Sequence, residues 1–350
     1  MQNWMKNIRT VTPYTPGEQP SFPDMVKLNT NENPYPPAPL VAEALRGQNA
    51  GNLRLYPDPT VGMLVHELSV SYGLQDSQVF VGVGSDDVLA MCFLTFFAGK
   101  EPILFPDISY SFYEVWADVF RIPFRKVPLD PDFRLMVQDY MPPNGGIIFP
   151  NPNAPTGLAI GLDEIRTVLD HNPDVIVIVD EAYIDFGGES ALALLKEYEN
   201  LLVVQTFSKS RSMAGMRIGF AMGSPELIRC LNNVKYAVNS YTMSRTAIEA
   251  GTAAVKEQQY YKECCRRIIA TREDAKVRLR KLGFSFPDSS TNFIFAAHAK
   301  VPARILFEDL REKHIFVRHF KQERIENYLR ITIGTPEQME ILYDFLENYL

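Results

Sequence analysis

Cysteine and histidine are scarce in this sequence, and neither is grouped as metal ligands would be. The four cysteines are Cys92, Cys230, Cys264 and Cys265, and no two of them are separated by two residues. The five histidines show no ligand spacing either. This pattern argues against a disulfide framework and against a zinc site. We therefore expect reduced thiols in a cytoplasmic protein that holds no metal.

Long apolar runs and blocks of one charge are also missing. No run approaches the ~20 apolar residues that a membrane-spanning helix needs, and MQNWMKNIRT at the start lacks the apolar core of a signal peptide. The formal net charge is −7, and the lysines and arginines are scattered along the chain. We therefore expect neither nucleic acid nor a membrane as a partner.

What is present is the composition of an ordinary globular protein, with 46% hydrophobic and 22% charged residues among 350. Such a length exceeds one small core and indicates more than one domain. Residues 1–40 are rich in proline and asparagine, which predicts an extended arm. We expect a large domain over residues 41–245 and a smaller α+β domain over residues 246–350.

Short apolar runs alternate with helical patterns through the predicted large domain. Runs without polar alternation are typical of strands that are buried on both faces. The predicted strands are 79–84, 102–105, 146–149, 175–180, 201–207 and 217–223. Helical patterns, such as those at 85–97 and 162–170, separate several of them. This alternation predicts an α/β fold with a mostly parallel sheet.

Residues able to bind a ligand follow two of the predicted strands, where ligands gather in open α/β sheets. After VFVGV comes Gly84, and then Ser85 and Asp86 open a helix whose free N–H groups suit a phosphate. An ordinary helix cap is the alternative interpretation. After VIVIV comes Asp180, a carboxylate that is costly to bury unless a cation pairs with it. A capped strand end is the alternative there.

Lys209 follows the next predicted strand and is surrounded by groups that bind anions. A lysine at a strand end can simply extend its amine to the surface. Here, however, the hydroxyls of Thr206, Ser208 and Ser210 flank it, and Arg217 lies just beyond. A lysine that can form an imine, an aspartate for a ring nitrogen and a phosphate cradle are the parts of a pyridoxal phosphate site.

Several segments carry a resemblance to a known family. They are RLYPDPT, VGVGSDD, NPNAPTG, VDEAYIDF, TFSKSRSMAGMRIGF and YLRITIGT, preceded by the arm LNTNENPYPP. Together and in this order they resemble the fold-type I pyridoxal-phosphate aminotransferases over nearly the whole chain. The set is most similar to the histidinol-phosphate aminotransferases. The resemblance implies a large cofactor-binding domain with a mostly parallel mixed sheet, a smaller α+β C-terminal domain, and a homodimer.

The resemblance also implies a role for each residue that matches a family motif. Lys209 would bind the cofactor, pyridoxal 5'-phosphate, and then transfer the substrate proton. Asp180 would hold the ring nitrogen, Tyr183 would hydrogen-bond the phenolic oxygen, and Tyr110 would stack on the ring. The cofactor phosphate would be bound by Ser85, Asp86, Thr206, Ser208 and Arg217, and, from the neighbouring subunit, Tyr56.

The substrate contacts implied by the resemblance come from both ends of the chain. Arg330, aided by Arg318, would grip the anionic end of the substrate. Tyr14 and Asn31, from the arm, would lie near the substrate as well.

One position departs from the family pattern. An asparagine commonly precedes Pro-Thr-Gly and bonds the phenolic oxygen of the cofactor, but this chain has Ala154 there. Either Asn153 takes over that contact or Tyr183 carries it alone.

The function that the resemblance implies is reversible amino transfer between L-histidinol phosphate and 2-oxoglutarate, giving imidazole-acetol phosphate and glutamate, in histidine biosynthesis. Aromatic amino-acid aminotransferases and threonine-phosphate decarboxylases share much of the same pattern and stay as alternatives. A non-catalytic binding protein of the same fold is a more distant alternative. The intact set of Lys209, Asp180 and Arg217 argues against it.

Overall fold

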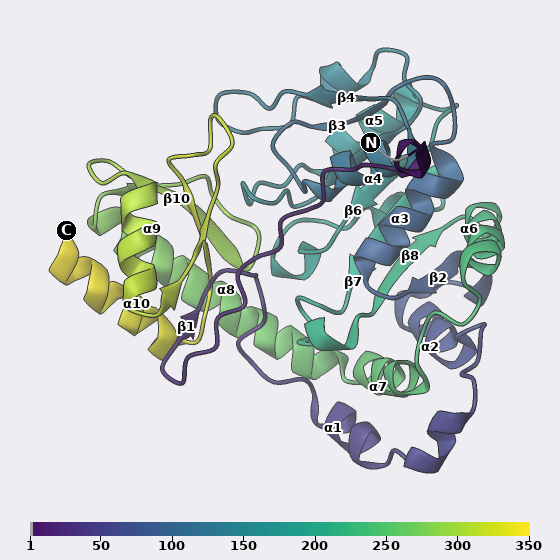
Figure 1. Ribbon diagram of the computed structural model, residues 1–350, viewed down its shortest axis with the longest axis horizontal. Helices are drawn as coiled ribbons and strands as arrows, with labels where there is room; N and C mark the ends of the chain where they lie inside the picture. The colour runs from purple at the N-terminus through teal and green to yellow at the C-terminus, as the bar shows by residue number, and fades with distance from the viewer. Residues whose placement is uncertain (1–2) are drawn as a thin grey trace.

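The centre of the molecule is a mixed sheet (Figure 1). In the computed structural model, which describes residues 3–350, this sheet has seven strands. At one edge, β2 runs antiparallel to its neighbour β8. β8 is also antiparallel to β7, whereas the strands from β7 to β4 run parallel. In spatial order the strands are β2 (Val79–Gly82), β8 (Gly219–Gly223), β7 (Leu201–Thr206), β6 (Val177–Asp180), β5 (Ile147–Pro150), β3 (Ile103–Pro106) and β4 (Phe124–Val127). The predicted α/β class is confirmed.

Each predicted strand has a counterpart in this sheet. The sheet also contains β4, which the sequence did not predict. β4 lies at the edge of the sheet, and its central residues Arg125 and Lys126 are exposed. An edge strand needs no continuous apolar run, so the pattern that predicted the inner strands does not detect it.

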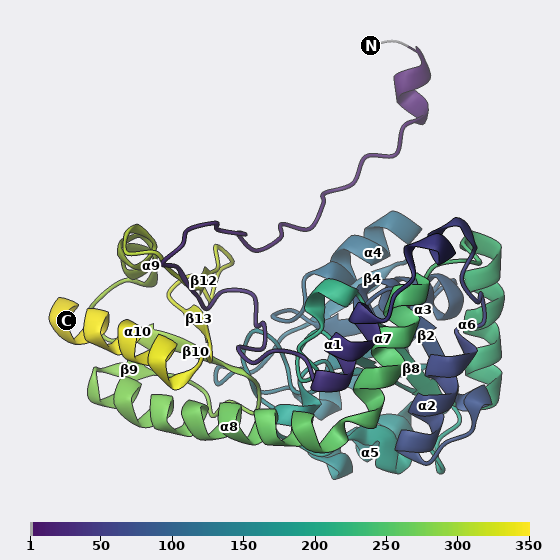
Figure 2. The ribbon, with the colours of Figure 1, turned by 90° about the horizontal axis from the view of Figure 1, so that it is seen from below.

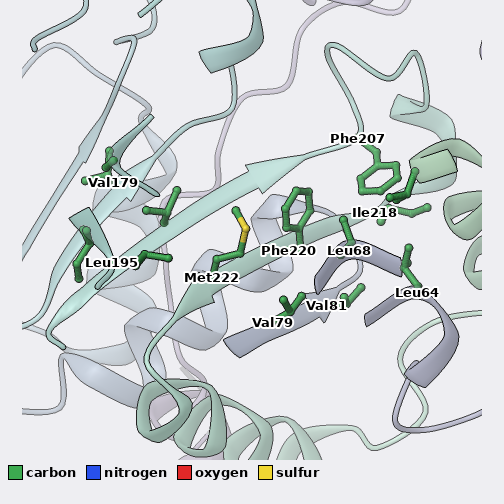
Figure 3. Close-up of a cluster of buried hydrophobic side chains, with 14 of the residues drawn as sticks. Leu64, Leu68, Val79, Val81, Val179, Leu195, Phe207, Ile218, Phe220 and Met222 are labelled. Atoms are coloured by element: carbon green, nitrogen blue, oxygen red, sulfur yellow. The ribbon is translucent and has the colours of Figure 1, made fainter. Parts of the chain in front are cut away.

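Helices cover both faces of the sheet. Along β6, Val177 and Val179 face one helical layer and Ile178 faces the other, as the alternation of side chains along a strand requires. The first layer contains α1 (Pro39–Arg46), α2 (Gly62–Tyr72), α5 (Leu162–His171) and α7 (Arg245–Lys256). The second contains α3 (Ser85–Phe96), α4 (Phe112–Phe120) and α6 (Pro225–Val238). Figure 3 shows part of the first layer, with Leu64 and Leu68 of α2 near side chains of β2 and β8.

A second core lies beside the first and is built mostly from the C-terminal part of the chain (Figure 1). Its sheet has the order β12-β13-β10-β9 and is antiparallel. Its elements are α8 (Gln258–Lys281), β9 (Phe284–Ser285), β10 (Phe293–His298), α9 (Ala303–Glu312), β11 (Ile315–Phe316), β12 (Arg318–His319), β13 (Leu329–Thr332) and α10 (Pro336–Tyr349). Figure 2 shows α8 running along both halves of the molecule.

The division between the two cores falls after α7. This helix packs against α1 and α2, and its side chains Ala247, Ile248 and Val255 belong to the first core. The second core begins within α8, whereas the sequence predicted the smaller domain from residue 246. The sequence pattern placed α7 in the smaller domain, whereas its side chains pack on the larger half.

The arm is tied to the smaller half. β1 (Val26–Lys27) pairs in parallel with β11, and Leu28 N donates to Phe316 O at 2.7 Å. Before β1 the chain runs without regular structure past Tyr14, which packs on Phe112, to a short N-terminal helical turn that stands clear of the body in Figure 2. The remaining short turns of 3-10 helix are η1 (Asn3–Asn7), η2 (Ala50–Arg54), η3 (Asp76–Gln78), η4 (Val137–Tyr140), η5 (Ile184–Phe186), η6 (Ala191–Leu194) and η7 (Ala214–Met216).

Within residues 3–350, none of the helices is both long and apolar enough to span a membrane. The same residues do not gather His, Cys, Asp or Glu side chains into a group that could hold a metal ion.

Candidate active site

A pocket of about 510 Å³ lies where the two halves and the arm meet. Its floor is formed by the carboxyl ends of β6 and β7, as expected for a ligand site in an open α/β sheet. The structure brings most of the predicted site residues into its wall, namely Tyr14, Asn31, Ser85, Asp86, Tyr110, Asp180, Tyr183, Thr206, Ser208, Lys209, Arg217, Arg318 and Arg330. A larger hollow of about 790 Å³ elsewhere contains neither Lys209 nor Asp180. The smaller pocket is therefore the candidate active site.

Lys209 extends from the loop after β7 into this pocket. Its Nζ donates to the backbone oxygen of Thr30 in the arm at 3.1 Å and lies 5.6 Å from the centre of the Tyr183 ring. Its own backbone oxygen accepts from Nδ2 of Asn33 at 3.1 Å. The arm thus holds both the main chain and the amine of the lysine, a contact that the sequence did not predict.

Asp180 ends β6 and is only 5% exposed. The hydroxyl of Tyr113 donates to Oδ2 at 2.7 Å, and Ala182 N donates to Oδ1 at 3.3 Å. Burial raises the pKa of Asp180 to about 6, although both hydrogen bonds act to lower it. Both donors are neutral, so a protonated ring nitrogen would stabilise this carboxylate.

A group of donors forms a cradle at the start of α3. Gly84 has φ of +86°, and the free N–H groups of Ser85 and Asp86 begin the helix. A side chain at Gly84 would come within 2.5 Å of Nη2 of Arg217, so glycine keeps the cradle open. Ser208 Oγ accepts from Arg217 Nη1 at 3.4 Å. The arrangement suits the cofactor phosphate.

The Asp86 side chain bonds the neighbours of this cradle. Its Oδ2 accepts from Arg217 Nη2 at 2.8 Å, and its Oδ1 accepts from the Tyr110 hydroxyl at 2.6 Å. A carboxylate repels a phosphate, so Asp86 would contribute its backbone N–H while its side chain orients Arg217. Arg217 itself has φ of +50°, a strained conformation of the kind found at functional sites.

Arg330 of β13 reaches the pocket from the smaller half. Its Nη2 donates to Asn29 O at 3.1 Å, while its Nε is buried without a hydrogen-bond partner among the described residues. The rings of Phe293 and Phe320 lie 5.4 and 5.8 Å from the guanidinium carbon. Burial, together with the nearby charge of Arg318, lowers the pKa of Arg330. An anionic ligand would supply the missing partner.

Arg318 lies directly opposite Arg330 in the β12–β13 ladder, so both side chains project from the same face. Arg318 donates to Pro16 O at 3.3 Å and to Thr15 O at 3.2 Å, which ties down the arm. Next to these residues, the Tyr14 ring stacks on Phe112 at 4.3 Å. Arg318 therefore shares the face of Arg330 and also holds the arm.

Two predicted site residues do not line the pocket. The Asn153 side chain donates to Ile108 O at 3.0 Å and to Thr156 Oγ1 at 2.9 Å, and it borders the larger hollow instead. This orientation does not support a contact of Asn153 with the cofactor, whereas Ala154 is in the pocket wall. Tyr56 is 79% exposed and packs on Tyr241, with ring centres 4.7 Å apart.

Two residues next to the site were not singled out in the sequence. Tyr113 binds Asp180, and its spacing of three positions from Tyr110 at a helix start could have indicated a shared face. Glu181 is buried, and burial raises its pKa to about 7, although Ser190, Gln205 and Ala191 donate to it. The sequence singled out Asp180 at this strand end, and Asp180 lines the pocket, but it did not indicate that the neighbouring Glu181 is buried and hydrogen-bonded.

The site therefore fits pyridoxal phosphate. Within residues 3–350 Asp180 has no positive partner, the cradle near Arg217 is open and rich in donors, and Lys209 lies in the same pocket. The fold and this site define a pyridoxal-phosphate-dependent aminotransferase of the α/β class.

Comparison with known proteins agrees with that class. Residues 23–346 match the family model of class I and II aminotransferases, and the chain belongs to this family. Within it, the chain is similar to histidinol-phosphate aminotransferases over nearly its full length. That of Clostridium acetobutylicum is 50% identical, with 99% of this chain and 98% of the relative covered. That of Lactococcus lactis subsp. cremoris is 51% identical at the same coverages. The resemblance expected from the sequence is confirmed.

A solved structure also shares the fold. The histidinol-phosphate aminotransferase of Sinorhizobium meliloti, in complex with pyridoxal-5'-phosphate, superposes with a TM-score of 0.84 at 24% identity. The match covers 91% of this chain and 89% of that one.

Proposed function

We propose that this chain transfers the amino group of L-histidinol phosphate to 2-oxoglutarate, giving imidazole-acetol phosphate and glutamate, as a step of histidine biosynthesis in the cytoplasm. The observation that carries the proposal is one pocket that combines Lys209 and Asp180 with the guanidinium of Arg330. The similarity to histidinol-phosphate aminotransferases supports the choice of substrate.

The residues of the large half hold and tune the cofactor. Asp180 holds its negative charge against the ring nitrogen and keeps that nitrogen protonated. Tyr183 donates a hydrogen bond to the phenolic oxygen. Tyr110 packs against the ring. The phosphate is bound by the cradle and the donors around it, which are Ser85, Asp86, Thr206, Ser208 and Arg217.

Lys209 performs the proton transfer. Pyridoxal phosphate, when bound, supplies an electron sink for the charge that develops when the Cα proton of the substrate leaves. The Lys209 amine would hold the cofactor and, once the substrate amine has replaced it, would take up the Cα proton and pass it on rather than return it to Cα. Its contact with Thr30 O keeps the amine at the pocket face that the arm covers.

The anion-binding face must accept two unlike ligands in turn. Histidinol phosphate presents a phosphate, and glutamate presents a carboxylate. The planar fork of Arg330 can donate two parallel hydrogen bonds to either anion. Arg318 adds positive charge from the opposite position in the ladder. The imidazole would then lie against Tyr14 and Tyr110, with Asn31 near the reacting end.

A homodimer completes the proposed site. Tyr56 is 79% exposed and lies in an exposed apolar area with Leu53 and Tyr241, at 77% and 46% exposure. Exposed apolar and aromatic side chains that lie close together on a monomer are typical of protein interfaces. We infer that a second copy covers this area and that Tyr56 donates to the cofactor phosphate of the neighbouring subunit.

A visible absorption titration tests the proposal. The purified protein, loaded with pyridoxal phosphate, is titrated separately with L-histidinol phosphate, phenylalanine and glutamate. We expect histidinol phosphate to convert the cofactor band to an amine-type band at far lower concentration than phenylalanine. Preference for phenylalanine would instead indicate an aromatic amino-acid aminotransferase. If no cofactor band forms, the proposed enzymatic function is wrong.

A further inference from the structure

Asn31 is held in a fixed position between the two halves of the molecule. It is 1% exposed and has φ of +56°, in the left-handed region. Its backbone N–H donates to Thr332 Oγ1 at 3.0 Å, and its backbone oxygen accepts from Asn292 Nδ2 at 3.0 Å. A buried, left-handed residue with both main-chain groups bonded has little freedom to move.

The same contacts orient the side-chain amide of Asn31. Because Thr332 Oγ1 accepts from the Asn31 N–H, the Thr332 hydroxyl proton is free for Oδ1 of Asn31, which lies 3.0 Å away. With Oδ1 engaged in this way, Nδ2 points to the hydroxyl oxygen of Tyr183 at 2.8 Å. Asn31 therefore donates, and the Tyr183 oxygen accepts.

This donation decides where the proton of Tyr183 goes. A tyrosine hydroxyl has a single proton, and with Asn31 on an acceptor position that proton is left for the pocket. The charged groups that face the Tyr183 ring there are Lys209 and Arg330. A guanidinium has only donors, and the Lys209 amine already donates to Thr30 O. An oxygen of a bound ligand in the pocket can accept this proton.

Ala154 leaves this part of the pocket wall without an amide donor of its own. Its methyl group lines the same pocket and belongs to the same apolar cluster as Tyr183. A methyl cannot donate a hydrogen bond, and the amide of Asn153 is turned away. Tyr183 is thus left as the donor to the phenolic oxygen in this part of the wall.

We propose that Asn31 is a positioning residue that fixes the Tyr183 hydroxyl as a hydrogen-bond donor to the phenolic oxygen of pyridoxal phosphate. The inference rests on the proposed function, since it needs that cofactor as the acceptor. Donation to the phenolic oxygen withdraws charge from it and weakens its hold on the proton of the neighbouring lysine-linked nitrogen. Loss of the donor must therefore raise the pH at which the bound cofactor loses that proton.

The test is a pH titration of the visible band of the loaded protein, without substrate. Asn31→Gly removes the amide, and glycine adopts the φ of this position without strain. We expect the midpoint of the titration to move upward by about one pH unit, the size of one hydrogen bond. Tyr183→Phe should move it at least as far. In the double variant the Asn31 change should add nothing, because its effect passes through the Tyr183 hydroxyl.

Further variants separate positioning from general damage. Gln19→Ala removes another arm amide of the pocket wall that bonds Lys27 and should leave the midpoint unchanged. Ala154→Asn, added to Asn31→Gly, should return the midpoint toward that of the wild type. An unchanged midpoint in Asn31→Gly overturns the inference. So does a double variant in which Asn31→Gly shifts the midpoint of Tyr183→Phe as much as it shifts that of the wild type. In both cases the wild-type titration still supports the proposed function. Absence of a cofactor band in the wild type overturns both.

Discussion

The hydroxyl of Tyr113 lies 2.7 Å from Oδ2 of Asp180, at the buried end of the strand that forms the floor of the site. The hydrogen bond stabilises the carboxylate, yet burial outweighs it and raises the pKa of Asp180 to about 6. The protein therefore keeps a carboxylate at the site whose charge becomes favourable only when a cation arrives.

The buried Asp180 predicts that the free energy of unfolding of the protein without cofactor depends on pH. The folded pKa of Asp180 is about 6, above the ordinary value of 3.8, so the folded state holds a proton more tightly than the unfolded state. The resulting stability is present below about pH 4 and is lost as the pH rises through 6. Between pH 4 and pH 7 this effect should lower the free energy of unfolding of the wild type by roughly 3 kcal/mol, and Asp180→Asn should not show that decrease.

Urea unfolding of wild type and Asp180→Asn, both without cofactor, checks this at several pH values. Burial also raises the pKa of Glu181, to about 7, but Glu181 is present in both proteins, so the difference between them reports on Asp180. Parallel pH profiles for the two proteins would contradict the prediction. With pyridoxal phosphate bound the order should reverse, because the asparagine cannot pair with the ring nitrogen.

Replacement of Lys209 should abolish turnover but leave the fold. Lys209→Ala removes the amine that we propose holds the cofactor and moves the proton, and a group of that kind contributes about 10²–10⁴-fold to rate. We expect a folded protein that binds pyridoxal phosphate without covalent attachment and has no measurable steady-state transfer. Lys126→Ala is the matched control, because Lys126 is exposed and paired with Glu114. Appreciable transfer by Lys209→Ala would rule out the assigned role.

Some of the site could be predicted from the sequence because its residues follow strands. Lys209 and Asp180 come directly after apolar runs, and the carboxyl ends of adjacent parallel strands meet at one edge of a sheet. Local order along the chain therefore translates into proximity. The same reasoning detects Ser85, which follows β2 and begins α3.

The rest depends on contacts between distant parts of the chain. Asn31 and Thr332 are 301 positions apart, and nothing near either residue indicates that they bond. Asn153 looked able to replace the amide missing at Ala154, but the direction of its side chain is decided by Ile108 O and Thr156, which the motif does not specify. Side-chain direction is a tertiary property, so motif spacing did not predict it.

The two arginines of the β12–β13 ladder should differ in their effects on substrate binding. Arg330→Gln removes a guanidinium whose Nε has no hydrogen-bond partner in the part of the chain that the structure describes, so we expect the KM for histidinol phosphate and for glutamate to rise about 10–100-fold. Arg318→Gln should have a smaller effect, because Arg318 already donates to Thr15 O and Pro16 O. Steady-state kinetics with each substrate measures both. Arg304→Gln, an exposed change beside Glu308, serves as the control.

An unchanged KM for both substrates in Arg330→Gln would exclude Arg330 from anion binding. A larger effect of Arg318→Gln than of Arg330→Gln would assign the main anion contact to Arg318 instead.

The predicted role of Tyr56 can be tested by combining two defective subunits. Tyr56→Phe would remove the proposed hydrogen bond to the cofactor phosphate, worth about 1.5–3 kcal/mol, so cofactor retention should fall, whereas Tyr241→Phe should leave it unchanged. Mixed dimers of Tyr56→Phe and Lys209→Ala subunits separate the two possible geometries. If Tyr56 acts across the interface, the subunit that keeps Lys209 receives an intact Tyr56 from its neighbour, and one full site per dimer regains wild-type cofactor retention and turnover. If Tyr56 acts on its own subunit, or not at all, mixing restores nothing. Cofactor dissociation measured by absorbance after co-refolding of the two variants decides between these outcomes.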